Sequence, residues 1–168
     1  MVIARTAAAL EHLGRQFAAR TVAKRYLAVV RGVMRQDVYR IDAAIGRHAV
    51  ERKKMSTRAP RARAAITRVR VLERFPGATL VEAAPETGRT HQIRVHLAAR
   101  GHAIIADGVY GHPRPAESKW IGRHALHAAA LTVAHPARGE SMTFQAELWP
   151  DMIALLTTLR AIRDTQSS

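Results

Sequence analysis

The residues best suited to chemistry lie in one short segment, residues 86–97, which reads ETGRTHQIRVHL. It holds two arginines, two histidines and a glutamine around a single glycine. A guanidinium such as that of Arg94 can grip a carboxylate or a phosphate with two hydrogen bonds when a rigid element holds it. His91 and His96 are five residues apart, whereas a helical zinc pair needs a spacing of four, and the chain has no cysteine. The segment therefore favours anion recognition over metal binding.

The elements around this segment are predicted to hold it in place. Apolar residues near Val81 predict a strand, and residues 85–88 predict the turn that ends it. Thr90 is a suitable cap for a short helix over residues 91–100, in which Ile93 and Leu97 share the buried side. Arg94 then lies within the first turns of a rigid helix.

The rest of the chain predicts strands that follow strands, with few helices between them. This order is typical of an α+β fold with a mixed, largely antiparallel sheet and flanking helices. We expect one domain over residues 1–163 and a disordered tail at 164–168. The last helix should begin near Pro150 and bury Ile153, Leu156 and Leu159, whereas the first should bury Ala9, Leu10, Leu13 and Phe17. Strands are expected at 26–30, 38–45, 65–75, 78–83, 126–134 and 141–148, a loop or hairpin tip at 51–63, and a connection at 112–122.

The charge of the chain is its strongest compositional feature. Lysine and arginine number 27 against 13 acidic residues, a formal net charge of +14. Such an excess favours a polyanionic partner, through release of counterions from phosphates, over a merely basic surface. Aromatic residues are only 5% of the chain, so phosphate contacts are expected rather than a platform for stacking many bases. Ten basic residues concentrate in one stretch with two acids: Arg47, Arg52, Lys53, Lys54, Arg58, Arg61, Arg63, Arg68, Arg70 and Arg74.

Targeting signals are not evident. No run of apolar residues is long enough for a membrane span, and the first residues lack the features of a signal peptide. The lack of cysteine fits a reducing compartment. We therefore expect a cytoplasmic protein with no membrane partner.

The segment 88–96, GRTHQIRVH, resembles a motif of the RNA pseudouridine synthases that modify large-subunit ribosomal RNA and some transfer RNA. Residues 101–111 resemble the next family segment, with Gly108 in place of its usual proline, and residues 24–30 resemble the motif that supplies an active-site tyrosine. Residues 126–128 and 135–136 also match, so the resemblance extends over nearly the whole chain.

The resemblance implies the pseudouridine synthase fold and a cofactor-free isomerisation of uridine to pseudouridine in RNA. Tyr26 would stack on the target base and is a candidate for removing its C5 proton, and Arg94 would pair with the catalytic carboxylate. Asp107 would stabilise a turn, and His96 would be structural. The expected RNA-binding residues are Arg47, Arg52, Lys53, Lys54, Arg89, Thr90, His91 and Gln92.

The family's nucleophilic aspartate lies in a His-Arg-Leu-Asp motif that has no match in this chain. Residues 1–6 resemble the strand that follows this motif in the family, so we expect the sequence to begin just after its nucleophile and to be inactive by itself. Whether that carboxylate attacks the sugar or removes the 2′ proton stays open. The expected partner is RNA, most simply ribosomal RNA with transfer RNA as the other option, bound by a monomer. A non-catalytic RNA-binding module of the same family, or a generic basic ribosome-associated protein, are the alternatives.

Overall fold

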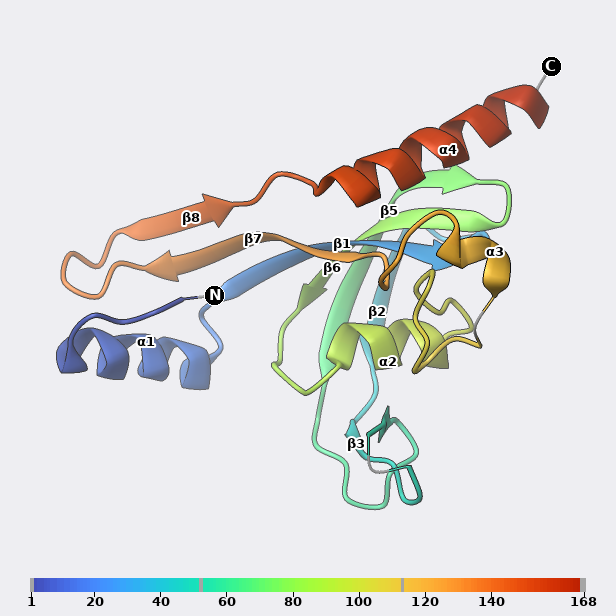
Figure 1. The fold of residues 1–168 in the computed structure, drawn as a ribbon. Coiled ribbons are helices and arrows are strands. Elements are labelled where there is room, and N and C mark those ends of the chain that lie inside the picture. The colour runs from blue at the N-terminus through green and yellow to red at the C-terminus, as the bar shows by residue number, and fades with distance from the viewer. Residues whose placement is uncertain (1, 52, 113, 167–168) are drawn as a thin grey trace.

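A computed structural model describes residues 2–51, 53–112 and 114–166, and it contains a six-stranded sheet with helices beside it (Figure 1). The strand order is β2-β5-β6-β1-β7-β8, and each of these neighbouring pairs is antiparallel. The predicted α+β fold with a largely antiparallel sheet is therefore confirmed. The elements are α1 (Ala7–Ala19), β1 (Ala23–Arg31), β2 (Val38–Asp42), β3 (Gly46–Arg47), β4 (Met55–Ser56), β5 (Ile66–Phe75), β6 (Ala78–Pro85), α2 (Gln92–Ala99), α3 (Pro115–Ser118), β7 (Leu126–Ala134), β8 (Ser141–Gln145) and α4 (Pro150–Gln166).

The central strands are formed by the most continuous apolar runs of the sequence. In β1 the residues Ala28, Val29 and Val30 are all fully buried, because this strand has neighbours on both edges and is covered on both faces. β5 and β6, two of the predicted strands, pair as a hairpin, and Gly77 at its tip has a φ of +74°, a conformation that glycine adopts without strain. The sheet thereby fixes the position of β1, which carries Tyr26, and of the turn that follows β6.

Two helices pack on the central strands, with α4 above them and α2 below them in the view of Figure 1. From α2, Ile93 and Leu97 enter the main core as predicted. No helix among the described residues has both the length and the apolar character needed to cross a lipid bilayer.

The prediction for α4 was partly wrong. Leu156 and Leu159 are buried as expected, together with Met152 and Leu155, but Ile153 is 52% exposed. The buried stripe is therefore rotated by one position. The helix also continues through Gln166, so residues 164–166 of the predicted disordered tail are helical.

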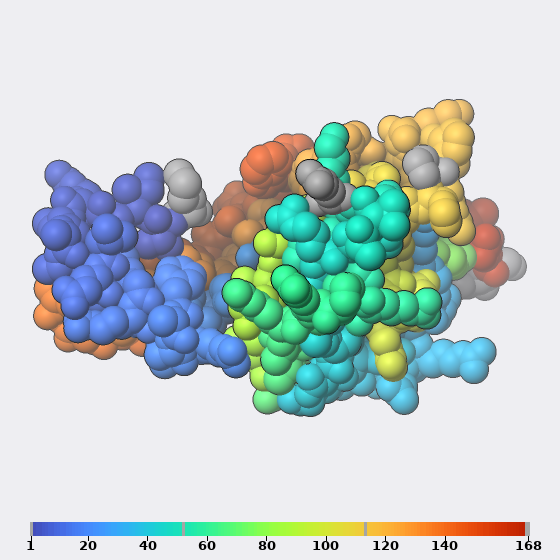
Figure 2. All heavy atoms as spheres, turned by 90° about the horizontal axis from the view of Figure 1, so that it is seen from below, coloured from blue at the N-terminus to red at the C-terminus, as the bar shows by residue number. Residues whose placement is uncertain are grey.

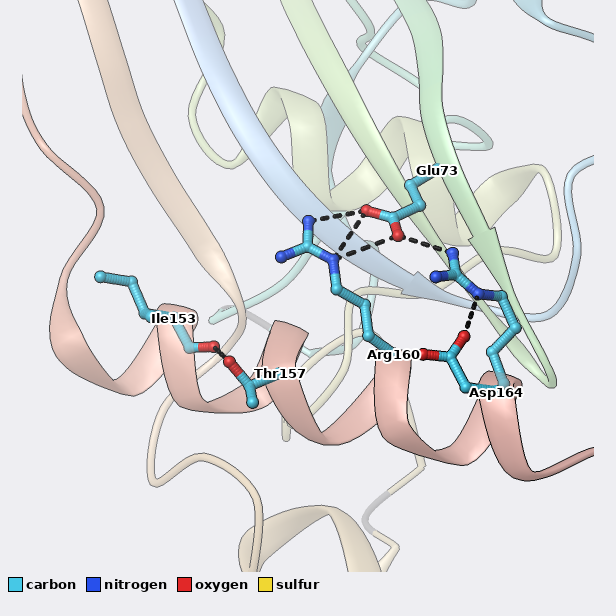
Figure 3. Close-up of polar contacts among 6 residues, drawn as sticks. Glu73, Ile153, Thr157, Arg160 and Asp164 are labelled. Carbon is cyan, nitrogen blue, oxygen red and sulfur yellow. Dashed lines mark hydrogen bonds and ion pairs between the residues drawn. The ribbon is translucent and has the colours of Figure 1, made fainter.

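A polar contact also ties α4 to the sheet. Figure 3 shows the carboxylate of Glu73, from β5, between guanidinium groups of the last helical turns. The Arg160 Nη2 and Arg163 Nη1 atoms lie 2.8 and 2.7 Å from its two oxygens. These groups are partly exposed, so the contact orients the helix more than it stabilises it.

The N-terminal end differs from the prediction as well. Residues 2–4 form no strand ladder with any described residue. A strand exchanges backbone hydrogen bonds with a neighbouring strand, and no described segment pairs with these residues in that way. Thr6 caps α1 by accepting a hydrogen bond from the Ala9 N–H. Of the expected apolar stripe only Leu13 is buried, against Val22 and Val133, whereas Leu10 and Phe17 are exposed.

Candidate active site

A cleft of about 310 Å³ lies where β1, the turn after β6, the start of α2 and the segment before β7 meet. It brings together five of the predicted site residues, although they come from different parts of the sequence. Thr90 is exposed beside the cleft and does not line it. The lining residues are Lys24, Tyr26, Pro85, Thr87, Gly88, Arg89, His91, Gln92, Ile93, Arg94, His124 and Leu126.

The turn before α2 is held by the side-chain amide of Gln92. Its Oε1 accepts hydrogen bonds from the Thr87 hydroxyl and the Arg89 N–H, at 2.6 and 3.0 Å. Its Nε2 donates to the Ile66 carbonyl and to the Thr67 hydroxyl, at 2.9 and 3.0 Å. An amide has two acceptor and two donor positions, so all four are used within the protein. This buried side chain therefore shapes the turn, and the RNA contact expected of Gln92 stays a prediction.

The helix does not begin as predicted. The N-cap residue is His91 and not Thr90; its side chain makes no capping hydrogen bond, and its backbone is in the left-handed conformation with φ +55° and ψ +20°. The Arg89 carbonyl accepts the Gln92 N–H, so the turn itself provides the contact expected from a hydroxyl cap. A non-glycine residue in this region costs roughly 1–2 kcal/mol. The fold thus holds His91 in a strained backbone conformation at the edge of the cleft.

Arg94 is held by a two-point contact with a carboxylate of its own chain. Its Nε and Nη2 donate to the two oxygens of Asp107 at 2.7 and 2.8 Å. The Asp107 side chain is fully buried, and its Oδ1 also accepts the N–H groups of Val109 and Tyr110. Burial alone would raise the pKa of Asp107, but these hydrogen bonds outweigh it and hold that pKa below its usual value. The expected turn-stabilising role of Asp107 agrees with this geometry, and the carboxylate also orients Arg94.

The aromatic ring of Tyr110 packs beside this ion pair. The Arg94 guanidinium lies over the ring at 4.9 Å from its centroid, and the ring of His91 meets it edge-on at 5.6 Å. The Tyr110 hydroxyl oxygen is 2.8 Å from His91 Nδ1 and accepts a hydrogen bond from the Met55 N–H at 2.9 Å. Tyr110 therefore contacts Arg94, His91 and the strand β4 at once.

Burial changes the protonation behaviour of the cleft. It lowers the pKa of His91, His124 and Lys24, and the nearby charge of Arg94 lowers the pKa of both histidines further. Both effects favour the neutral form of the two histidines. No carboxylate is among the described residues that line the cleft, and no group of three or more His, Asp and Glu side chains in the described parts of the chain could hold a metal ion.

His96 points away from the cleft and is structural, as predicted. It is fully buried, with Nδ1 at 2.8 Å from the Thr67 hydroxyl and Nε2 at 2.9 Å from the Ala43 carbonyl. A carbonyl can only accept, so Nε2 carries the proton and Nδ1 accepts from Thr67. This arrangement joins α2 to β5 and to the segment after β2.

The first part of the predicted basic stretch forms a small hairpin, β3–β4, and the loop after it, and the last part lies on β5. Arg47 and Lys53 are exposed in the hairpin, and Lys54 is paired with Glu51 at 2.7 Å. Figure 2 shows this part of the chain, coloured cyan to green, projecting at the centre of the lower face. Gly46 permits the close packing of this hairpin, since a Cβ atom there would lie 2.6 Å from the Arg61 carbonyl oxygen. Arg52, also predicted to bind RNA, lies outside the described residues.

A second hollow of about 390 Å³ adjoins the cleft and shares Lys24, Pro85 and Thr87 with it. Arg20 adds positive charge to its lining, whereas Arg68 is paired there with Glu86. The cleft is thus flanked by cations both along this hollow and on the β3–β4 hairpin.

Sequence reasoning missed three residues of the site. Lys24 and Tyr110 belong to segments that resemble the family, so their positions carried a signal that was not used. His124 had no such signal: it enters the cleft only because β7 pairs with β1 beside Tyr26.

Known proteins resemble this chain over most of its length. The profile of the family described as RNA pseudouridylate synthase matches residues 1–99. A ribosomal large subunit pseudouridine synthase D from Nitrosomonas europaea is 42% identical over 165 residues, which cover 95% of this chain and 47% of that protein. An uncharacterized RNA pseudouridine synthase from Bacillus subtilis, YlyB, is 41% identical over 160 residues, covering 95% of this chain and 52% of that protein. The chain spans about half the length of these relatives.

A solved structure shares the fold. Human RNA pseudouridylate synthase domain containing 1 superposes with a TM-score of 0.76 at 28% identity, over 94% of this chain and 73% of the human one. The names of these proteins do not favour the alternative of a non-catalytic binding module. On the family profile and on the identity to relatives over nearly its whole length, this chain belongs to the RNA pseudouridylate synthase family.

Proposed function

We propose that this chain forms the uridine-binding cleft of an RNA pseudouridine synthase that acts on large-subunit ribosomal RNA. The observation that carries the proposal is the cleft itself, which places Tyr26 of β1 and Arg94 of α2 in one lining. Its volume of about 310 Å³ is at the lower end of the roughly 300–1,000 Å³ of ligand sites, which suits a single nucleoside. The names of the bacterial relatives support the ribosomal substrate, and with it a cytoplasmic location.

The reaction requires that a uridine leave its base stack, because its glycosidic bond is not accessible within the stack. The bond between N1 and C1′ breaks, the uracil rotates, and a bond between C5 and C1′ forms. C5 then loses its proton and N1 gains one, so the product is an isomer of the substrate. In this proposal Tyr26 packs on the base and is the candidate that accepts the C5 proton.

Arg94 would orient the catalytic carboxylate. Two of its nitrogens are occupied by Asp107, and no described residue has a hydrogen bond to the third, Nη1. A guanidinium anchored in this way can offer that remaining nitrogen to a second carboxylate without losing its position. Asp107 is fully buried behind Arg94 and accepts four hydrogen bonds from three residues, so it does not itself serve as the nucleophile.

The flanking cations would bind the RNA backbone. Lys24 and Arg89 line the cleft, and Arg20 lies in the adjoining hollow. The β3–β4 hairpin adds Arg47, Lys53 and Lys54. Each phosphate contact releases counterions, so affinity should fall steeply with salt.

Photochemical crosslinking tests where the uridine lies. Bacterial 23S ribosomal RNA transcribed with 4-thiouridine is bound to the chain and irradiated, and the crosslinked peptides are identified by mass spectrometry. The proposal predicts crosslinks to residues 24–26 and 86–94, and their loss in Tyr26→Ala. Tyr39→Ala, on β2 and outside the cleft lining, is the matched control and should keep them. Crosslinks confined to α4 or to the hairpin would contradict the proposal.

A further inference from the structure

The hydroxyl of Tyr110 lies between two hydrogen-bonding groups that together decide where its proton goes. The Met55 N–H can only donate, so the Tyr110 oxygen accepts from it at 2.9 Å. The other contact, at 2.8 Å, joins the same oxygen to Nδ1 of His91. No other described group has a hydrogen bond to this hydroxyl, so its proton finds an acceptor only at Nδ1. Tyr110 O–H therefore donates to Nδ1, and the single ring proton of a neutral His91 is on Nε2.

We propose that His91 is a neutral hydrogen-bond donor, its Nε2–H tautomer selected by Tyr110, which binds an acceptor oxygen of the nucleotide in the cleft. This assignment rests on the proposed function, which supplies the ligand. It adds the donor atom, the protonation state of His91 and the residue that positions the His91 ring. Tyr110 is a positioning residue in this scheme, because it acts on the ligand only through His91.

The location of Nε2 supports a role in binding. His91 lines the cleft, its Nδ1 faces Tyr110, and no described residue has a hydrogen bond to Nε2. The backbone of His91 is also in the strained left-handed conformation. Strain of this kind persists where the surrounding structure requires one side-chain position, and it is concentrated at functional sites.

The charged and titratable groups around His91 favour its neutral form. On α2 the guanidinium of Arg94 repels a second positive charge, and on the loop after α2 the carboxylate of Asp107 opposes this only in part. His124, before β7, is the remaining titratable neighbour and is itself affected by both His91 and Arg94. On the hairpin side Lys54 lies near Tyr110. A neutral donor can bind an uncharged uracil carbonyl oxygen or a phosphodiester oxygen. His91 need not be charged for this, because Arg89 and Arg94 already supply positive charge in the cleft.

The same contacts join the basic hairpin to the cleft. Met55 belongs to β4, and its side chain packs with Tyr110 on the small core formed by Ile45, Ala65 and Val95. A displacement of β4 would therefore remove the donor that orients the Tyr110 hydroxyl. The hairpin strand β4 is thus in direct contact with the residue that positions His91.

Nitrogen NMR of the chain without RNA tests the tautomer directly. At pH 7, long-range proton–nitrogen spectra should show His91 with a protonated Nε2 and an unprotonated Nδ1. Tyr110→Phe should produce a mixture of tautomers. Tyr39→Phe, which removes a hydroxyl that accepts the Gln36 N–H, should leave the His91 signals unchanged. A proton on Nδ1 at pH 7 in the unaltered chain, or a His91 spectrum insensitive to Tyr110→Phe, would overturn the proposal.

Two substitutions of His91 test the binding atom. The amide nitrogen of His91→Gln reaches the position of Nε2, whereas that of His91→Asn reaches only the position of Nδ1. We expect His91→Gln to keep its affinity for 23S RNA and His91→Asn to lose about five- to tenfold, the worth of one hydrogen bond. Backbone strain predicts the reverse order, because asparagine tolerates the left-handed conformation better than glutamine. Equal losses in both variants, or a larger loss in His91→Gln, would contradict the assignment.

Small ligands identify the oxygen that is bound. Uridine 5′-monophosphate and ribose 5-phosphate are titrated separately while the Nε2 resonance of His91 is followed. A shift with both compounds assigns the bond to phosphate, and a shift with the uridine compound alone assigns it to the base. A cleft that binds uridine 5′-monophosphate without any shift at Nε2 would contradict this inference. Failure of the chain to bind either compound would count against the proposed function, whereas the tautomer is measured without a ligand.

Discussion

At the scale of single residues, the central contact of the site is the buried pair of Arg94 and Asp107. The two-point grip expected of Arg94 was predicted from the segment 86–97, but its partner in this structure was not. Asp107 is thirteen residues further along, on a loop whose path depends on α2 and on the bridge between Val30 and Ile104. Local sequence patterns describe neighbours along a helix or strand, and they do not place two loops against each other.

Replacing Asp107 should therefore be costly. In Asp107→Asn the Arg94 charge loses its carboxylate inside the protein, and we expect about 3 kcal/mol of lost unfolding free energy. Asp42→Asn is the matched control, because its pair with Arg40 is about half exposed and is worth at most about 1 kcal/mol. Urea unfolding of both variants checks this, and similar losses in the two would show that the buried pair has no special role.

One buried and two partly buried histidines predict a dependence of stability on pH. Burial lowers the pKa of His96, of His91 and of His124, so at mildly acidic pH the unfolded chain binds protons that the folded chain does not. Their contribution is complete above the unfolded pKa of about 6.5, and it is lost as the pH falls from there toward the lowered native values. The melting temperature should be lower at pH 5 than at pH 7.5. His96→Gln, whose neutral amide can still donate to the Ala43 carbonyl, should reduce this difference; an unchanged difference would assign it to other groups.

At the scale of elements, strands were predicted more reliably than helix faces. The alternation and length of β1, β5, β6 and β7 follow from apolar patterns that depend only on neighbours in the same strand. Helices α1 and α4 each carry more apolar positions than one face can bury, so the sheet decides which are covered. This is why Leu10 and Ile153 are exposed although both fit a helical stripe.

Alanine substitutions in α4 test the corrected face. Leu155→Ala removes a fully buried side chain and should destabilise the protein by about 2–5 kcal/mol. Ile153→Ala, two positions earlier and half exposed, should change stability by no more than about 0.5 kcal/mol. Thermal unfolding of both variants gives the comparison. A larger loss in Ile153→Ala than in Leu155→Ala would restore the stripe that the sequence predicted.

The hairpin β3–β4 is expected to bind phosphates. Reversing the charges of Lys53 and Lys54 should weaken RNA binding and reduce the slope of log affinity against log salt by about 0.7–0.9 for each lost contact. Reversing Arg160 and Arg163 is the control, because these arginines pair with Glu73 on the other side of the sheet from α2 in Figure 1. Fluorescence anisotropy with a ribosomal RNA fragment at several salt concentrations measures both. Equal effects of the two double variants would mean that binding follows overall charge.

At the scale of the whole molecule, the cleft combines groups that act on a uridine with cations that hold RNA, but no carboxylate is among its described lining residues. The family resemblance predicted this combination, since the His-Arg-Leu-Asp motif has no match in the sequence. Its three-dimensional basis was not predictable from local patterns. It depends on β1 lying between β6 and β7, which brings Tyr26, Arg94 and His124 to one place.

The most direct test of the account is release of tritium from RNA labelled at C5 of its uridines. Residues 1–168 alone should release none above background, because loss of a nucleophile removes on the order of a thousandfold or more of an enzyme's rate. A version preceded by the family's His-Arg-Leu-Asp segment should release tritium, and Arg94→Ala in that version should abolish most of the release. Robust release by residues 1–168 alone would mean that Asp107 or another group of this chain acts as the nucleophile, and the account would be wrong.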